Sequence, residues 1–143
     1  MSVVERLRGV DWEGLSVSYV VLFGSMARRP GRARDIDLGV KFTCRPSLDL
    51  VGEVLERVSE ATGFAVDRID LVILNRRDLP CTLVREVYCK GRLVYCADRD
   101  EYLDDLLYWV KLCYDYEIMA RKNRVLGTAL EVVKRRWGLS GSY

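Results

Sequence analysis

The sequence contains no histidine, no glutamine and only two asparagines, Asn75 and Asn123. The lack of histidine excludes His-based catalytic triads, histidine metal ligands and imidazole general bases. The scarcity of heat-labile amides, alongside many Arg and Glu residues, is typical of proteins from hot environments and predicts a thermophilic source. Any catalysis in this chain must therefore depend on carboxylates, hydroxyls, amines or thiols.

Metal-binding cysteine motifs are also missing. The cysteines are odd in number and are never spaced as C-x-x-C: Cys44, Cys81, Cys89, Cys96 and Cys113. This pattern argues against a zinc site and against the disulfide framework of a secreted protein. We therefore expect the cysteines to be buried free thiols.

Long hydrophobic runs and strong charge imbalance are absent as well. No run approaches the ~18 apolar residues of a membrane span, and no N-terminal stretch has the pattern of a signal peptide. These features predict a soluble, cytoplasmic protein without membrane contact. The formal net charge is only +2, so we expect no direct nucleic-acid binding, and any nucleotide must bind at a local site.

What the 143 residues do contain is an alternation of strand and helix patterns. Strands are predicted at residues 16–23, 35–42, 67–74 and 92–96, and helices at residues 3–8, 48–62 and 79–89. Residues 98–137 are predicted to form a helical hairpin or one long bent helix that is weakest at Gly127. The order predicts an α/β or α+β domain over residues 1–97. A helical extension over residues 98–143 is expected to pack on the same domain.

Two apolar stripes follow the predicted C-terminal helix. The first consists of Leu103, Leu106, Leu107, Val110 and Cys113, and the second of Tyr102, Trp109 and Tyr116. One stripe can pack on the domain, while Tyr and Trp are favoured in interface cores. Two interpretations remain open: a protein interface, or a helix that is buried on both sides within its own chain. The basic residues farther along the helix are expected to form a solvated face.

The segment with the clearest chemical pattern begins at the end of the first predicted strand. Gly24 has no Cβ and lets backbone N–H groups approach a ligand closely, and Ser25 adds a hydroxyl at the start of the next turn. Backbone amides and a hydroxyl in this position can hold a phosphate group. Gly24 and Ser25 are therefore candidate nucleotide-binding residues.

Three aspartates complete the pattern. Asp35 and Asp37 are two residues apart on a predicted strand, so both project from one face, ~6.5 Å apart. Carboxylates at this spacing repel each other unless a cation lies between them, and their hard oxygens suit Mg²⁺ or Mn²⁺ bound with substrate phosphates. Asp70 lies within another predicted strand and joins the pair if the two strands are neighbours. Asp-x-Asp alone is common, and it is the conjunction of these features that predicts a nucleotidyl-transfer site.

A basic loop lies between these motifs. It contains Arg28, Arg29, Arg32 and Arg34. Arginines beside a phosphate site can bind a triphosphate or a partner through bidentate contacts. A solvated surface loop is an equal alternative.

The motifs Gly24-Ser25-x-Ala27-Arg28, Asp35-Ile36-Asp37-Leu38 and Ile69-Asp70-Leu71-Val72 resemble the minimal nucleotidyltransferase (MNT) family of the polymerase-beta superfamily. The stretch from Leu83 to Tyr95 also resembles the MNT antitoxins that are paired with HEPN-domain toxins. The resemblance covers most of the chain to about residue 97. One departure is Arg34, where the family usually has Ser before the first metal-binding aspartate.

The resemblance implies a polymerase-beta-like fold, a small mixed sheet flanked by helices. It implies metal on Asp35, Asp37 and Asp70, and nucleotide phosphates on Gly24 and Ser25. Arg28 is the one arginine of the basic loop that belongs to the family motif, and it is therefore the first nucleotide-binding candidate among the four. The implied activity is the transfer of AMP from ATP to a tyrosine hydroxyl of a HEPN-type ribonuclease toxin, which silences the toxin. Two alternatives remain open: transfer to a small-molecule acceptor, and a non-catalytic antitoxin that acts by binding. Homo- or hetero-oligomers can form through the C-terminal helices.

Overall fold

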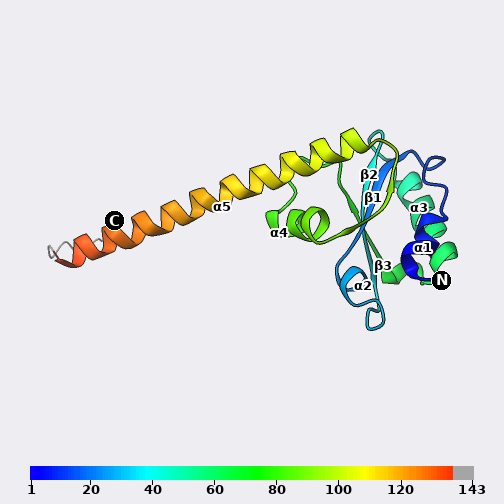
Figure 1. Ribbon diagram of the computed structural model, residues 1–143, viewed down its shortest axis with the longest axis horizontal. Helices are drawn as coiled ribbons and strands as arrows, with labels where there is room; N and C mark the ends of the chain where they lie inside the picture. The colour runs from blue at the N-terminus through cyan, green and yellow to red at the C-terminus, as the bar shows by residue number, and fades with distance from the viewer. Residues whose placement is uncertain (137–143) are drawn as a thin grey trace.

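The computed structural model describes residues 1–136 (Figure 1), so Trp137, the last residue of the expected helical tail, lies outside the described residues. The elements in chain order are α1 (Val3–Arg8), β1 (Val17–Phe23), α2 (Ser25–Arg28), β2 (Ile36–Phe42), α3 (Leu48–Thr62), the 3₁₀ turn η1 (Val66–Arg68), β3 (Ile69–Ile73), α4 (Cys81–Val84), the π-helical segment η2 (Arg85–Cys89), β4 (Arg92–Cys96) and α5 (Arg99–Arg136). The predicted order of strands and helices is confirmed.

The four strands form one mixed sheet in the order β3-β2-β1-β4. β1 is antiparallel to both β2 and β4, whereas β2 and β3 are parallel and are connected through α3. α3 begins where Ser47 accepts a hydrogen bond from the Leu50 N–H and ends at Gly63, which has a left-handed backbone. The predicted fold class, a small mixed sheet flanked by helices, is therefore confirmed.

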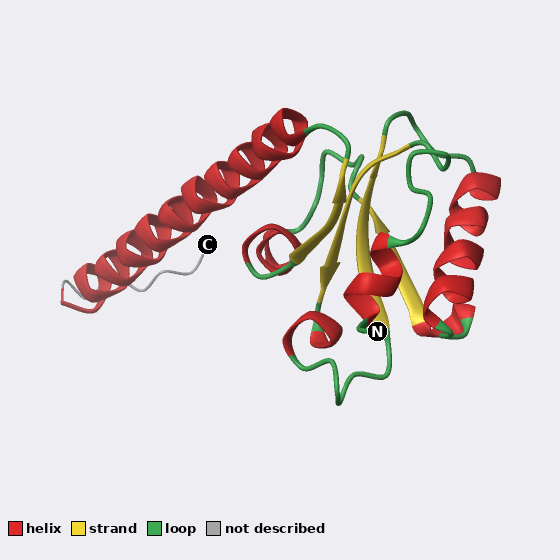
Figure 2. Ribbon diagram, turned by 45° about the vertical axis from the view of Figure 1, so that its right-hand side comes forward, coloured by secondary structure: helices red, strands yellow, loops and turns green. Residues whose placement is uncertain are grey.

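One face of the sheet is covered by α1 and α3, and we call it the α1/α3 face (Figure 2). Alternate residues of β2, Ile36, Leu38 and Val40, point into it and are fully buried. Leu7 from α1 and Val58 from α3 close the same cluster. The buried cluster on this face is built from apolar side chains.

The opposite face is covered by α4, η2 and the first part of α5, and we call it the α4/α5 face (Figure 2). It holds a buried polar network in which the Tyr19 and Tyr88 hydroxyl oxygens lie 2.6 Å apart. Tyr19 donates to Asp105 at 2.9 Å, and Asp105 also accepts from Lys41 at 3.0 Å. Burial, followed by the nearby Tyr88, raises the pKa of Tyr19 well above its usual range, so its hydroxyl stays protonated. The network fixes α5 against β1 and β2.

α5 is a single continuous helix of 38 residues that passes through Gly127 without a break. Of the two expected forms, the hairpin is therefore wrong and the single long helix is confirmed; Gly127 does not interrupt it, because one glycine lowers helix propensity by only ~1 kcal/mol. No helix within residues 1–136 is long and apolar enough to cross a membrane.

The predicted stripes on α5 are only partly correct. Trp109 is buried in the domain core and Tyr102 packs against it, whereas Tyr116 is 67% exposed. Leu103 and Leu107, expected to pack on the domain, are 47% and 64% exposed. The domain therefore buries the residues of the Tyr102–Trp109 side of the helix.

The cysteines also differ from expectation. Cys81 of α4 and Cys113 of α5 form a disulfide across 32 residues of sequence. Cys44 and Cys89 are exposed free thiols, and Cys96 is half-buried. The prediction of buried thiols is therefore wrong for four of the five, since it considered sequence spacing and not the contact between α4 and α5.

Asn75 extends the parallel strand pair beyond the end of β3. Its side-chain oxygen accepts from the Phe42 N–H at 2.9 Å, and its side-chain nitrogen donates to the Phe42 carbonyl at 3.0 Å. The amide thus takes the place of a backbone peptide group beside β2.

Candidate active site

Gly24 forms the tight connection between β1 and α2. Its φ of 71° and ψ of −153° lie in a region that is essentially restricted to glycine. A Cβ at this position would lie 2.3 Å from the Oδ2 atom of Asp37. Only glycine satisfies both the backbone conformation and this close approach. Ser25 follows immediately, is exposed, and begins the short helix α2.

Asp37 and Asp70 lie side by side on the parallel strands β2 and β3, where they are direct register partners. Asp37 is half-buried and Asp70 is exposed. Burial, followed by a hydrogen bond to Asp70 and the charges of Asp70 and Asp35, raises the pKa of Asp37 to about 6. The two strands thus hold two acids together in an arrangement that disfavours the fully ionised form.

Asp35 lies immediately before β2 and is close enough to contribute to the pKa of Asp37. Its carboxylate forms an ion pair with Arg68, with Oδ1 3.5 Å from the guanidinium Nη1. Within residues 1–136, no three Asp, Glu, Cys or His side chains converge in a group that could hold a metal ion. The structure therefore brings Asp37 and Asp70 together, and directs Asp35 toward Arg68.

The donor set nevertheless suits a hard divalent cation. Three carboxylates offer oxygen ligands, which Mg²⁺ and Mn²⁺ prefer. The absence of a Cβ at Gly24 leaves backbone next to Asp37, where a phosphate could approach. These residues fit a cation bound together with a nucleotide.

Arg28, the nucleotide-binding candidate at the end of α2, forms an ion pair with Glu86. Its Nη1 atom lies 2.8 Å from Oε2 of Glu86, and the other carboxylate oxygen of Glu86, Oε1, lies 3.5 Å from Nζ of Lys90. The sequence did not identify Glu86 as the partner of Arg28, because residues 79–89 were expected to form one regular helix. The π-helical geometry of η2, which is common at functional sites, has no sequence signal of this kind.

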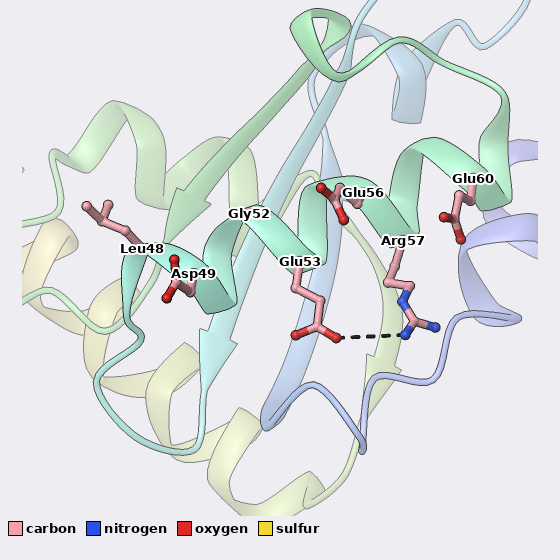
Figure 3. Close-up of a pocket in the computed structure, with 7 residues that line it drawn as sticks. All are labelled: Leu48, Asp49, Gly52, Glu53, Glu56, Arg57 and Glu60. Carbon is pink, nitrogen blue, oxygen red and sulfur yellow. Dashed lines mark ion pairs between the residues drawn. The ribbon is translucent and has the colours of Figure 1, made fainter.

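A separate hollow of about 740 Å³ lies along the outer face of α3 (Figure 3). Its charged lining consists of Asp49, Glu53, Glu56, Arg57 and Glu60. The single arginine is already paired with Glu53 at 3.7 Å. Such an acidic surface repels a triphosphate, and none of the predicted site residues line it.

The sequence pattern of one protein family matches most of this domain. The family is described as "Polymerase beta, Nucleotidyltransferase", and the match spans residues 13–100, which include all six candidate residues. The chain belongs to the polymerase beta nucleotidyltransferase family. The resemblance expected from the glycine and aspartate motifs is therefore confirmed at the level of the family.

Solved structures with the same family fold also resemble the chain. A toxin–antitoxin crystal structure with AMP-PNP is 19% identical with a TM-score of 0.57, covering 90% of this chain and 96% of that chain. A chain in the structure of a tri-AMPylated Shewanella oneidensis HEPN toxin in complex with an MNT antitoxin is 17% identical to this chain, with a TM-score of 0.55. The match covers 89% of this chain and 98% of that chain. A mutant of the MntA–HpeT toxin–antitoxin pair is 18% identical with a TM-score of 0.57, covering 90% and 95%.

At these identities the likeness shows the fold of the nucleotidyltransferase. No curated protein matches the sequence at a significant level. The family is thus established by the sequence pattern, and the architecture by the solved structures.

Proposed function

We propose that this nucleotidyltransferase is a cytoplasmic antitoxin that transfers AMP from ATP to a tyrosine hydroxyl of a HEPN-type ribonuclease toxin. The observation that carries the proposal is the Asp37–Asp70 pair, held beside Gly24 with the Asp37 pKa raised to about 6. Support comes from structures of the same fold, which include a tri-AMPylated HEPN toxin with an MNT antitoxin and a toxin–antitoxin complex with AMP-PNP.

In this proposal Asp35, Asp37 and Asp70 hold Mg²⁺ or Mn²⁺. When bound, the cation neutralises triphosphate charge and stabilises the charge that develops during transfer. Asp37, with a pKa of about 6, is already mostly ionised at neutral pH, and a bound cation favours its charged form further. Asp35 must turn away from Arg68, which is exposed and can rotate toward solvent. The acidic cluster is thus arranged for a ligand that compensates three negative charges.

Gly24, Ser25 and Arg28 are proposed to bind the nucleotide phosphates. The first N–H groups of a helix have no partner within that helix, and the Ser25 hydroxyl lies beside them. α2 has only four residues, so its dipole adds little and local hydrogen bonds dominate. Arg28 is 50% exposed and can exchange Glu86 for a phosphate oxygen.

Asp70 is the proposed general base. Its carboxylate is exposed on β3, the edge strand of the sheet, where a large acceptor protein can approach. The acceptor oxygen attacks the α-phosphorus, its proton passes to Asp70, the bond to the β-phosphate breaks, and pyrophosphate leaves.

We also propose that the two parts of the chain have different roles. Residues 1–97 form the nucleotidyltransferase domain, and residues 98–143 form an extension that takes part in protein contacts. The scarcity of amides supports a thermophilic source, and the Cys81–Cys113 disulfide adds to this support because intracellular disulfides are frequent in hyperthermophiles.

The test is to incubate the purified protein with Mg²⁺, ATP labelled in the α-phosphate and adenine, and a HEPN-type protein encoded beside it. We expect label on a tyrosine of the HEPN protein and loss of its ribonuclease activity. An unlabelled HEPN protein under turnover conditions would contradict the proposal. The Asp35→Ala/Asp37→Ala double variant separates catalysis from simple binding: full neutralisation by this variant would indicate a non-catalytic antitoxin.

A further inference from the structure

The C-terminal half of α5 leaves the domain and extends away from it (Figures 1 and 2). The last ion pair between α5 and the domain within the described residues joins Arg85 of η2 to Glu117. Residues 118–136, which we call distal α5, continue as regular helix beyond this point. Most helical stability in proteins comes from packing of an apolar face, so a contact with another molecule would stabilise this segment.

Distal α5 continues an apolar stripe that begins beside the domain. Leu112, Tyr116, Met119 and Asn123 follow the alternating four- and three-residue spacing of a heptad seam, and Leu130 lies one full heptad after Asn123. The apolar members are 45%, 67%, 57% and 59% exposed, in chain order. Tyr and Met are enriched in interface cores, and a contiguous exposed stripe of such residues marks an interaction site. We call these five residues the α5 seam.

The charge around the α5 seam indicates what binds it. Distal α5 contains six Lys and Arg residues and only one Glu. Two copies of this segment packed side by side would place these positive charges against each other, which disfavours self-association. The apolar side chains favour a protein over a nucleic acid, because nucleic-acid sites depend mainly on phosphate contacts.

We propose that the α5 seam binds an amphipathic helix of a partner protein whose apolar face is flanked by Asp and Glu residues. Leu112, Tyr116, Met119 and Leu130 pack between the apolar residues of that helix. Arg121, Lys122 and Arg124, which are exposed, lie next to its carboxylates. Asn123 lies at a seam position, where a single polar residue fixes the register of two helices.

The identity of the partner as the toxin rests on the proposed function, whereas the chemistry of the seam does not. The experiment therefore uses no nucleotide and no toxin. The full-length protein is titrated with two labelled synthetic peptides that share the same Leu heptad positions and one matching Asn. One peptide has Glu at the flanking positions and the other has Lys. Binding is measured by fluorescence anisotropy at low and high salt.

We expect the Glu peptide to bind at least about tenfold more tightly than the Lys peptide, with a preference that decreases at high salt. The Met119→Lys/Leu130→Lys variant is expected to weaken the Glu peptide by at least about tenfold, because it places charge within the seam. The matched control is Leu48→Lys, which changes an exposed leucine of α3 and should leave binding unchanged. Circular dichroism checks that each variant keeps its helix content. Asp37→Asn should bind the peptide as the wild type does, so a failure of catalysis and a failure of docking can be distinguished.

Four results would overturn the inference. The first is that neither peptide binds, and the second is that both bind equally. The third is a concentration-dependent dimer in light scattering that the Met119→Lys/Leu130→Lys variant abolishes, which would identify a second copy as the occupant. The fourth is seam-dependent binding of single-stranded RNA or of anionic phosphatidylglycerol vesicles at least as tight as that of the Glu peptide.

Discussion

The two faces of the sheet are built from the same strands and have different compositions. On β2, Leu38 points into the α1/α3 face and is fully buried, whereas its neighbour Asp37 points to the opposite side and lies next to Asp70. Lys41, farther along β2, belongs to the polar network of Tyr19 and Asp105. The α1/α3 face thus supplies apolar packing alone, whereas the α4/α5 side of the sheet combines a second apolar cluster around Trp109 with the acids and the buried polar contacts.

Successive side chains of a strand point to opposite faces of the sheet, so a small domain can place packing residues on one face and reactive residues on the other. Residues on one side of the pleat can be optimised for packing density. Residues on the other side hold charges close together at a cost in stability, because they are arranged for a ligand. Substitution of the acids should therefore reduce activity without reducing stability. Truncation of buried residues on the α1/α3 face should reduce stability without reducing activity per folded molecule.

The largest effect is expected for Asp37→Asn. The variant should reduce nucleotidyl transfer by more than about 100-fold, because it removes one of the proposed cation ligands. It should also raise the melting temperature of the unliganded protein, because the raised pKa of Asp37 means that its charge is unfavourable there. Labelled AMP transfer and thermal unfolding measure the two effects. Asp78→Asn, at an exposed carboxylate paired with Arg76, is the matched control for transfer. A lower melting temperature for Asp37→Asn would contradict the comparison.

The next effect is expected on the opposite face, for Leu7→Ala. Leu7 is fully buried on α1, so truncation leaves a cavity and should reduce the free energy of unfolding by about 2–5 kcal/mol. Leu48→Ala changes a leucine that is 90% exposed and should alter it by less than about 0.5 kcal/mol. Urea denaturation measures both. Transfer activity per folded molecule should remain that of the wild type, and a selective loss of activity in Leu7→Ala would show that the two faces are coupled.

A somewhat smaller effect is expected when the link between α4 and α5 is cut. The Cys81→Ser/Cys113→Ser variant should lose about 2–4 kcal/mol of unfolding free energy, because the disulfide restricts the unfolded chain. Adding reductant to the wild type should have the same effect in urea denaturation. Cys44→Ser, at an exposed free thiol, should leave stability unchanged. Equal stability of the double variant and the wild type would mean that the disulfide does not contribute to stability.

The smallest effect is expected from a change of pH, and the contribution of Asp37 to stability should vary only at acidic pH. The folded pKa of Asp37 is about 6, above the ordinary aspartate value of 3.8, so the folded state binds the proton more tightly than the unfolded state does. Stability should therefore be greatest below about pH 4, decrease between about pH 4 and 6, and stay constant above that range as far as Asp37 is concerned. Melting temperatures of the wild type and Asp37→Asn across this range measure the difference. An identical pH dependence of the two proteins would exclude Asp37 as the source.

Local sequence patterns predicted much of the architecture. The helical spacing between Ser47 and Gly63 predicted α3 with its true ends, because the cap residues act through adjacent backbone groups. Period-two alternation predicted β2, and β-branched and aromatic residues predicted β1. The neighbouring positions of Asp37 and Asp70 followed on the condition that β2 and β3 are neighbours, which the structure confirms. These features depend on interactions over a few residues or on one pairing of strands.

Features that depend on how distant segments meet could not be predicted. The Cys81–Cys113 disulfide requires the position of α5 on α4, and the partner of Arg28 depends on the π-helical turn that contains Glu86. The ion pair between Asp35 and Arg68 likewise joins a loop to a 3₁₀ turn. The sequence therefore predicted which candidate residues exist, and it could not predict which partners hold them in the unliganded protein.

The amide of Asn75 has a consequence for chemical ageing. Its nitrogen donates to the Phe42 carbonyl at 3.0 Å, so hydrolysis of this amide to a carboxylate would place one negatively charged oxygen against another acceptor. The end of the parallel strand pair would then lose a donor and gain a repulsion. The sequence contains no glutamine and only one other asparagine, Asn123, so Asn75 is one of two positions where amide hydrolysis could add a negative charge, and there it would loosen the end of the strand pair.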